Sequence, residues 1–182
     1  MKLPGDGSVS ALRSLVEMEK PANLTKFLAG FQYTAPALAG DLAAIERIAR
    51  EFCEDAAFNG LFYVEARFCP HLLLRPEAES SGVTADDIVE AVLRGFKESE
   101  AKCGLTARVL LCCIRGLDQF SEDVLRLCVK YRDQGVVGID VAGVGVYSLP
   151  VKTLSPNFIL NAIYMTKSAR NLNSLLKGTR RG

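Results

Sequence analysis

The stretch YVEARFCPHLLL, residues 63–74, carries the chain's single histidine, His71. A histidine just past an apolar strand-like segment could act as a general base, ligate a metal together with residues elsewhere, or simply pack. A metal centre built on histidines needs several imidazoles, and this chain has one. From the sequence alone, any serine and any acidic residue could be combined with this histidine, so the sequence does not specify a catalytic triad. We therefore expect a structural role for His71 at the end of the strand, with ligand contact as the alternative.

Charged side chains inside two apolar segments are the second candidate for chemistry. Glu65 and Arg67 lie two residues apart in FYVEARF, and Asp140 lies in GIDVAG. A polar network of these three side chains, with an ion pair in it, would fix the geometry of a sheet. We favour this structural interpretation over a direct catalytic role.

The cysteines and glycines predict no recognised site. The six cysteines lie among apolar neighbours without CxxC spacing, which favours free, reduced thiols over disulfides or a zinc site. The glycines of GVVGIDVAGVGV do not match the GxxxxGK[ST] phosphate loop. The H-x-E and P-C-x-x-C signature of the small zinc nucleobase deaminases is also missing.

Three helix–strand pairs must position these residues. Apolar residues recur at helical spacing in three segments, each of which starts at a capping residue and ends at a glycine. These segments are Asp41 to Gly60, Thr84 to Gly104 and Ser121 to Gly135. Each is followed by an apolar strand-like segment, LFYVEARFC, LTARVLLCCI and VVGIDVAG. Strands that alternate with helices at this spacing predict βα units and a parallel sheet.

Two local side-chain interactions are expected within these helices. Thr84 and Asp87 have the spacing of a capping box. Glu46 and Arg50 have the i,i+4 spacing of an ion pair on the exposed side of the first helix.

The first strand indicates which parallel architecture is present. Its even-numbered residues from 62 to 68 are apolar, whereas the opposite face carries Glu65 and Arg67. A strand covered by helices on both faces should be apolar on both. One polar face is typical of a strand that lines the interior of a closed barrel.

Composition favours one globular domain in the first part of the chain and a separate tail. The 182 residues are 49% hydrophobic and 24% charged, with a net charge of +1. No apolar run approaches the roughly 20 residues of a membrane span, and the opening MKLPGDGSVS lacks an apolar signal region, so we expect a cytoplasmic protein.

Residues 144–182 contain six basic residues and no acidic one, which places a boundary after residue 143. A helix beginning near Ser155 and Pro156 would be basic and amphipathic, but its charge density is modest, and neither nucleic acid nor membrane is expected as a partner.

Four segments together resemble the adenosine deaminase family. They are KPANLTKFLAGFQYTAPALAG, YVEARFCPHLLL, LLCCIR and VVGIDVAG, in the family's order. The resemblance covers residues 4 to about 143 and implies a TIM-type (β/α)₈ barrel with one catalytic zinc that converts adenosine to inosine and ammonia. The chain would then be α/β, an incomplete TIM-type (β/α) barrel of about three βα units in residues 1–143, followed by a basic tail in 144–182.

The resemblance also implies roles for individual residues in substrate binding. Leu24, Phe27 and Phe31 match the hydrophobic helix that gates the family's substrate pocket, although their spacing alone favours a helix face buried in the core. Leu72 and Ile114 match apolar residues that line the pocket. The backbone amide of Gly143 matches the one that meets the purine ring. His71 matches a histidine beside the pocket wall that is not a zinc ligand.

The same resemblance implies that the catalytic residues lie elsewhere. The family's H-x-H zinc pair would precede residue 1, and the sequence after Gly143 does not match the strands that supply the remaining zinc ligands and the catalytic glutamate. We therefore expect that the chain alone binds no catalytic zinc and does not deaminate adenosine. The alternatives are a non-catalytic fragment that binds a purine nucleoside or a protein partner at open barrel edges, and a splice or gene-model product without function.

Overall fold

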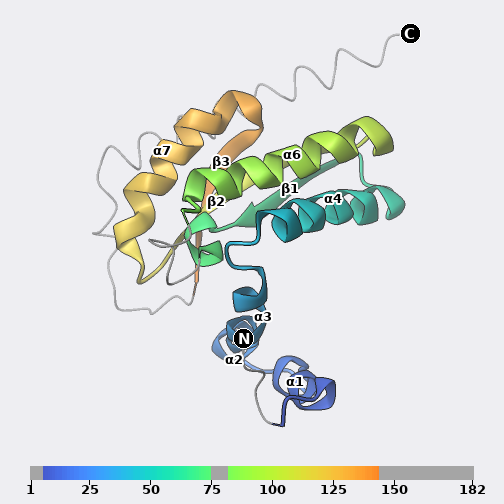
Figure 1. The fold of residues 1–182 in the computed structure, drawn as a ribbon, viewed down its shortest axis with the longest axis vertical. Coiled ribbons are helices and arrows are strands. Elements are labelled where there is room, and N and C mark those ends of the chain that lie inside the picture. Colours follow the sequence, from blue (N-terminus) through green and yellow to red (C-terminus); the bar gives the residue numbers. More distant parts are fainter. Residues whose placement is uncertain (1–5, 75–81, 144–182) are drawn as a thin grey trace.

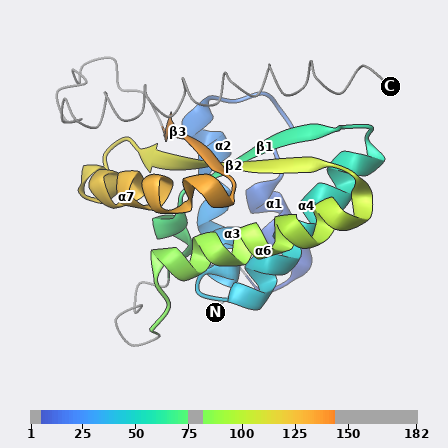
Figure 2. The same cartoon turned by 90° about the horizontal axis from the view of Figure 1, so that it is seen from above.

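A three-stranded parallel sheet forms the centre of the protein in the computed structural model, which describes residues 6–74 and 82–143. The strands are β1 (Tyr63–Phe68), β2 (Thr106–Ile114) and β3 (Val136–Ala142), in the order β1-β2-β3. Helices α4 (Leu42–Phe58), α6 (Ala85–Cys103) and α7 (Ser121–Tyr131) precede them and cover one face of the sheet (Figure 1, Figure 2). The prediction of three helix–strand units around a parallel sheet is confirmed.

The core lies between this layer of helices and one face of the sheet. Fully buried residues come from both layers, among them Ile88 of α6, Leu111 of β2 and Leu127 of α7. The side chains of Val64 and Ala66 on β1 pack against the same cluster. The opposite face of β1 carries Glu65 and Arg67, so the alternation read from the sequence separates a packed face from a polar face.

The helix ends follow the sequence signals in two of three cases. The Asp41 carboxylate accepts a hydrogen bond from the Ala44 amide. After the last residue of α4, Phe58, the chain turns at Gly60 (φ +80°), and the Leu61 amide donates to the Ala56 carbonyl. In α6 the capping box of Thr84 and Asp87 is present, and Gly104 ends the helix in the left-handed conformation.

The predicted start of α7 at Ser121 is confirmed, but Ser121 does not cap the helix. Ser121 is the first residue of the helix and no side chain caps it, because the 3₁₀ turn η2 (Asp118–Phe120) leads directly into it. A second 3₁₀ turn, η3 (Arg132–Gln134), extends the helix to Gly135 (φ +126°).

The close contact between α4 and α6 depends on a glycine. A Cβ at Gly95 would lie 2.5 Å from the Glu46 carbonyl oxygen and 2.9 Å from the Ala49 Cβ. The buried Ser99 hydroxyl donates to the Arg50 carbonyl across the same contact, at 3.1 Å.

The predicted Glu46–Arg50 pair is wrong, since both residues instead pair across the contact between α4 and α6. Glu46 accepts from Arg94 at 2.8 Å, and Arg50 pairs with Glu98 at 3.4 Å. Facing side chains on the neighbouring helix thus compete successfully with an i,i+4 partner on the same helix.

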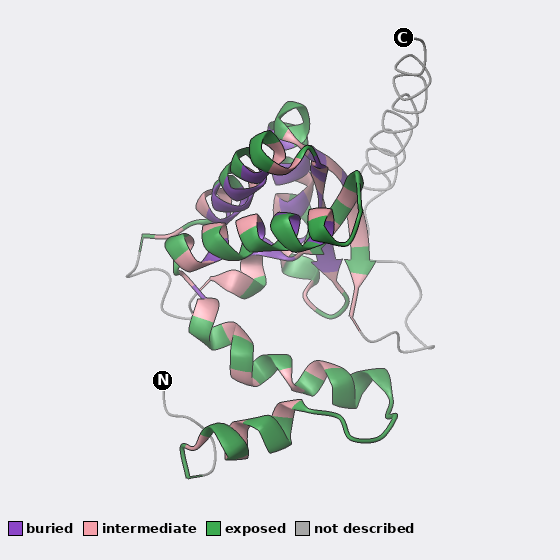
Figure 3. Ribbon diagram, turned by 90° about the vertical axis from the view of Figure 1, so that its right-hand side faces the viewer, coloured by how far each residue is buried: buried purple, intermediate pink, exposed green. Residues whose placement is uncertain are grey.

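Three short helices precede this layer and extend away from it (Figure 1, Figure 3). They are α1 (Val9–Val16), α2 (Leu24–Ala29) and α3 (Phe31–Leu38), and none of their residues is buried. The Gly40 amide donates to the Leu73 carbonyl at 2.8 Å, which joins the end of α3 to the turn after β1. Among the described helices, none has an apolar stretch long enough to cross a membrane. The predicted tail of residues 144–182 lies outside the described residues.

Candidate functional site

The predicted pocket residues of the sheet lie at one edge, where the three parallel strands end. Leu72 lies in the turn η1 (Pro70–Leu73) directly after β1, Ile114 is the last residue of β2, and Gly143 follows β3. In βα architectures this edge is where binding sites are built. The Leu72 side chain is 49% exposed, so it is available for contact. Gly143 adopts φ +93°, and an added Cβ would lie 3.4 Å from the Ile114 Cγ2.

The three apolar residues of the first helices are exposed. Leu24, Phe27 and Phe31 are 52%, 53% and 54% exposed, so the interpretation of this face as core is wrong. The helix is interrupted at Gly30 between α2 and α3, yet the rings of Phe27 and Phe31 remain in edge contact with centroids 5.8 Å apart. The structure therefore presents an apolar surface on these helices.

The three charged residues of the sheet do not form one network. The Arg67 guanidinium donates to the Asp140 carboxylate at 3.2 Å across β2, which joins the first strand to the third. Glu65 instead accepts a hydrogen bond from the Tyr63 hydroxyl at 2.7 Å. The Arg67 side chain is 62% exposed, so its ion pair adds little to stability.

His71 is held by two residues that precede and begin α7. Its Nε2 lies 2.9 Å from an Asp123 carboxylate oxygen, and its ring stacks on Phe120 with centroids 4.4 Å apart. The side chain is only 5% exposed, and Nδ1 has no hydrogen-bond partner among the described residues. These contacts connect the end of β1 to the start of α7. Sequence reasoning missed both partners, since 52 residues separate His71 from Asp123.

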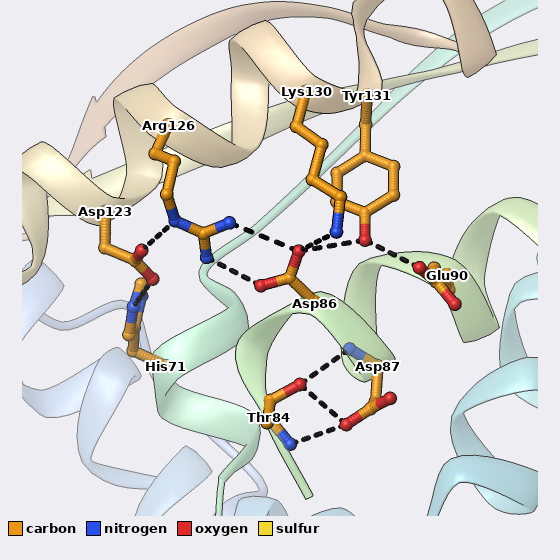
Figure 4. Close-up of polar contacts among 9 residues, drawn as sticks. All are labelled: His71, Thr84, Asp86, Asp87, Glu90, Asp123, Arg126, Lys130 and Tyr131. Atoms are coloured by element: carbon orange, nitrogen blue, oxygen red, sulfur yellow. Dashed lines mark hydrogen bonds and ion pairs between the residues drawn. The ribbon is translucent and has the colours of Figure 1, made fainter.

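Asp123 also begins a chain of polar contacts between α6 and α7 (Figure 4). Arg126 donates to Asp123 at 2.6 Å and to both carboxylate oxygens of Asp86, at 2.6 and 3.3 Å. Lys130 contributes a further contact to Asp86 at 2.6 Å. The Tyr131 hydroxyl completes the chain, 3.0 Å from Asp86 and 2.7 Å from Glu90. The contacts tie two helices together beside the edge that carries His71.

The charges of this chain of contacts shift the pKa of its members. Hydrogen bonds from Arg126 above all, then from Lys130 and Tyr131, hold the pKa of Asp86 well below its ordinary value. Burial tends to raise the pKa of Asp123, but the hydrogen bonds from Arg126 and His71 outweigh it and lower the pKa. Burial, followed by the neighbouring carboxylates, raises the pKa of Tyr131 to about 12. At neutral pH, Asp86 and Asp123 are therefore ionised and Tyr131 is neutral.

The buried thiols are poor nucleophiles. All six cysteines are free, as predicted, and all but Cys103 are buried. Burial raises the pKa of Cys112 and Cys128 to about 12 and of Cys53 and Cys113 to about 11. Since the thiolate is the reactive form, these side chains act as small apolar residues.

A groove of about 910 Å³ lies at the opposite edge of the sheet. It is lined by residues of α6 and of η3 and by the first residues of β2 and β3, including Lys97 and Arg108. None of the predicted pocket residues lines it.

The described residues do not fit a zinc centre. In residues 6–74 and 82–143, no three side chains of histidine, cysteine, aspartate or glutamate gather into a group that could hold a metal. The single histidine of the chain is committed to Asp123 through Nε2. The site at this edge can therefore offer apolar surface, backbone amides and carbonyls, but no assembled metal ligands.

Comparisons with known proteins match this fold and this sequence. The family model described as adenosine deaminase matches residues 1–154. The adenosine deaminase of Bos taurus is 42% identical over 148 residues, which are 78% of this chain and 40% of the bovine protein. The chain thus spans about two fifths of the length of that relative.

Solved structures show the same fold. An amidohydrolase from Burkholderia ambifaria, with bound Zn, matches with a TM-score of 0.66 and 20% identity over 89% of this chain and 42% of its own. The Arabidopsis ADAL protein complexed with IMP matches with a TM-score of 0.61 and 27% identity, over 81% of this chain and 42% of its own. The described α/β fold is therefore an incomplete TIM-type barrel of three βα units. The chain belongs to the adenosine deaminase family.

Proposed function

We propose that this chain provides the wall of a purine nucleoside pocket from an adenosine deaminase and that, by itself, it binds the nucleoside without deaminating it. The observation that carries the proposal is the placement of Leu72, Ile114 and Gly143 at the carboxyl ends of three adjacent parallel strands. An exposed apolar surface for a planar ring and a backbone amide beside it are the groups that a purine requires. The IMP bound by the Arabidopsis relative supports a purine ligand.

The lack of turnover follows from the chemistry that the chain can supply. Hydrolytic deamination in this family is a zinc-dependent reaction, in which the metal lowers the pKa of a water molecule. The Zn of the Burkholderia neighbour supports that assignment for the family. The 182 residues contain one histidine, whose Nε2 is engaged by Asp123. Six free cysteines support the cytoplasm, a reducing compartment, as the location of the chain.

The proposal is tested with the purified 182-residue chain and adenosine. We expect adenosine to raise the melting temperature in a saturable manner, because a ligand that binds only the folded state stabilises it. We expect no conversion to inosine, followed by ultraviolet absorbance, with or without added Zn²⁺. Zinc-dependent turnover by the pure chain would contradict the proposal.

A pair of glycine variants separates the site from general stability. Gly143→Val places a side chain against Ile114 and should abolish the adenosine-dependent shift. Gly60→Val changes another glycine of positive φ, which lies at the end of α4 with open space around it, and should leave the shift intact. Equal loss in both variants would assign the effect to folding rather than to the pocket.

A second candidate role is binding of a protein partner. In the described sheet, β1 and β3 each have one neighbour, so each has an unpaired edge that another chain could extend. This role predicts a folded chain whose melting temperature does not respond to adenosine. The same measurement therefore distinguishes the two roles.

A further inference from the structure

Arg115 reaches from the end of β2 to the backbone around Gly143. Its backbone amide donates to the Ala142 carbonyl at 3.0 Å. Its guanidinium Nη1 donates to the carbonyl of Val141 at 3.0 Å and to the carbonyl of Gly143 at 3.1 Å. The exposed side chain of Arg115 thus binds the carbonyls of Val141 and Gly143, on either side of the Ala142 carbonyl. The backbone amide of Arg115 binds the Ala142 carbonyl itself.

These contacts fix the direction of the Gly143 amide. The peptide between Ala142 and Gly143 is planar and trans, so its N–H points away from its carbonyl. Because the Ala142 carbonyl points to Arg115, the residue that follows β2, the Gly143 N–H must point away from β2. Gly143 itself adopts φ +93°, a conformation that glycine leaves easily unless its neighbours hold it.

We propose that Arg115 is a positioning residue that holds the Gly143 amide in the direction required for contact with a purine ring. The inference rests on the proposed function for the identity of the ligand, but the positioning itself rests on the three hydrogen bonds. An arginine suits this place because Nη1 carries two hydrogens in a fixed plane and hydrogen bonds from a charged donor are strong. A lysine keeps the charge but lacks the planar geometry.

The test measures the backbone order parameter of Gly143 by ¹⁵N relaxation in the full chain. In the wild type we expect a value of about 0.85, and in Arg115→Ala a value below about 0.6, the ranges of rigid and flexible backbone. Arg115→Lys should give an intermediate value. The amides of Val109 and Leu111, within β2, should not change. Arg47→Ala removes an exposed arginine that, among the described residues, pairs with Glu51 on α4, and it serves as the matched control.

Two results would overturn the positioning role. The first is an unchanged order parameter of Gly143 in Arg115→Ala, and the second is an equal fall throughout the sheet, which would make Arg115 a general stabilising residue.

A titration with adenosine separates this inference from the proposed function. We expect adenosine to shift the Gly143 amide resonance in the wild type and to bind at least about 10-fold more weakly to Arg115→Ala, equivalent to about 1.4 kcal/mol. Equal affinity for the two proteins would overturn the role of Arg115 in binding. If adenosine shifts no resonance of the wild type, the proposed function fails, while a selective fall in the Gly143 order parameter would still support the positioning by Arg115.

Discussion

His71 shows how one residue can look catalytic in sequence and be structural in its contacts. Its ring is almost completely enclosed, one nitrogen is held by Asp123, and one face is covered by Phe120. A general base must reach its substrate within hydrogen-bond distance, and a side chain that is 5% exposed has little room for that. The contacts favour a role in docking the turn after β1 onto α7.

Variants of His71 separate packing from hydrogen bonding. His71→Ala removes the buried ring and should lower the free energy of unfolding by about 3 kcal/mol. His71→Phe keeps the stacking on Phe120 and loses only the hydrogen bond to Asp123, so it should cost about 1 kcal/mol. Urea unfolding of the three proteins measures both differences. A ligand role for His71 would instead appear as a stable His71→Phe protein that no longer responds to adenosine.

The helices and strands were predictable wherever the signal lies within the element itself. Asp41, Thr84 and Gly104 act on residues three or four positions away, and their effects could be read from the sequence. The partners of Glu46 and Arg50 could not, because the side chains that compete for them lie on α6, 48 residues away.

The contact between α4 and α6 should be sensitive to one methyl group. In Gly95→Ala the new Cβ would meet the backbone of α4, which cannot rotate away as a side chain can. Overpacking of this kind costs about 1–3 kcal/mol, and the better helix propensity of alanine returns about 1 kcal/mol. We expect a net loss of about 1 kcal/mol in the free energy of unfolding, measured by chemical denaturation.

An exposed substitution on the same helix is the matched control for Gly95→Ala. Lys97→Ala should change the free energy of unfolding by less than about 0.5 kcal/mol. Equal effects of the two variants would show that α6 does not pack closely against α4 through Gly95.

At the scale of the whole molecule, the site is defined by the order of parallel strands. The sequence placed Leu72, Ile114 and Gly143 at the ends of three successive strands, and parallel pairing then brings those ends to a common edge. The contact between Arg115 and Gly143 could not be predicted from the sequence, because it depends on the register between β2 and β3, which includes a shift after Val109. The sequence also overestimated the polar network of the sheet, where Glu65 turns to Tyr63.

The polar contacts between α6 and α7 should make the stability of the whole fold depend on acid pH. Asp86 has a pKa held below the ordinary value of about 3.9 by Arg126, Lys130 and Tyr131, so its contribution is complete above that value and is lost as the pH falls towards the lower pKa of the folded state. Asp123 changes in the same direction. We expect the wild type to lose more free energy of unfolding between about pH 6 and pH 3 than Asp86→Asn does.

This comparison is made by urea unfolding at the two pH values. At about pH 6, Asp86→Asn should be about 2 kcal/mol less stable than the wild type, because the hydrogen bonds from two cations lose their charged acceptor. Asp133→Asn removes a carboxylate that is 91% exposed, and it should follow the wild-type curve at both values. Parallel pH curves for the wild type and Asp86→Asn would show that the contacts of Asp86 do not cause the pH dependence of the stability.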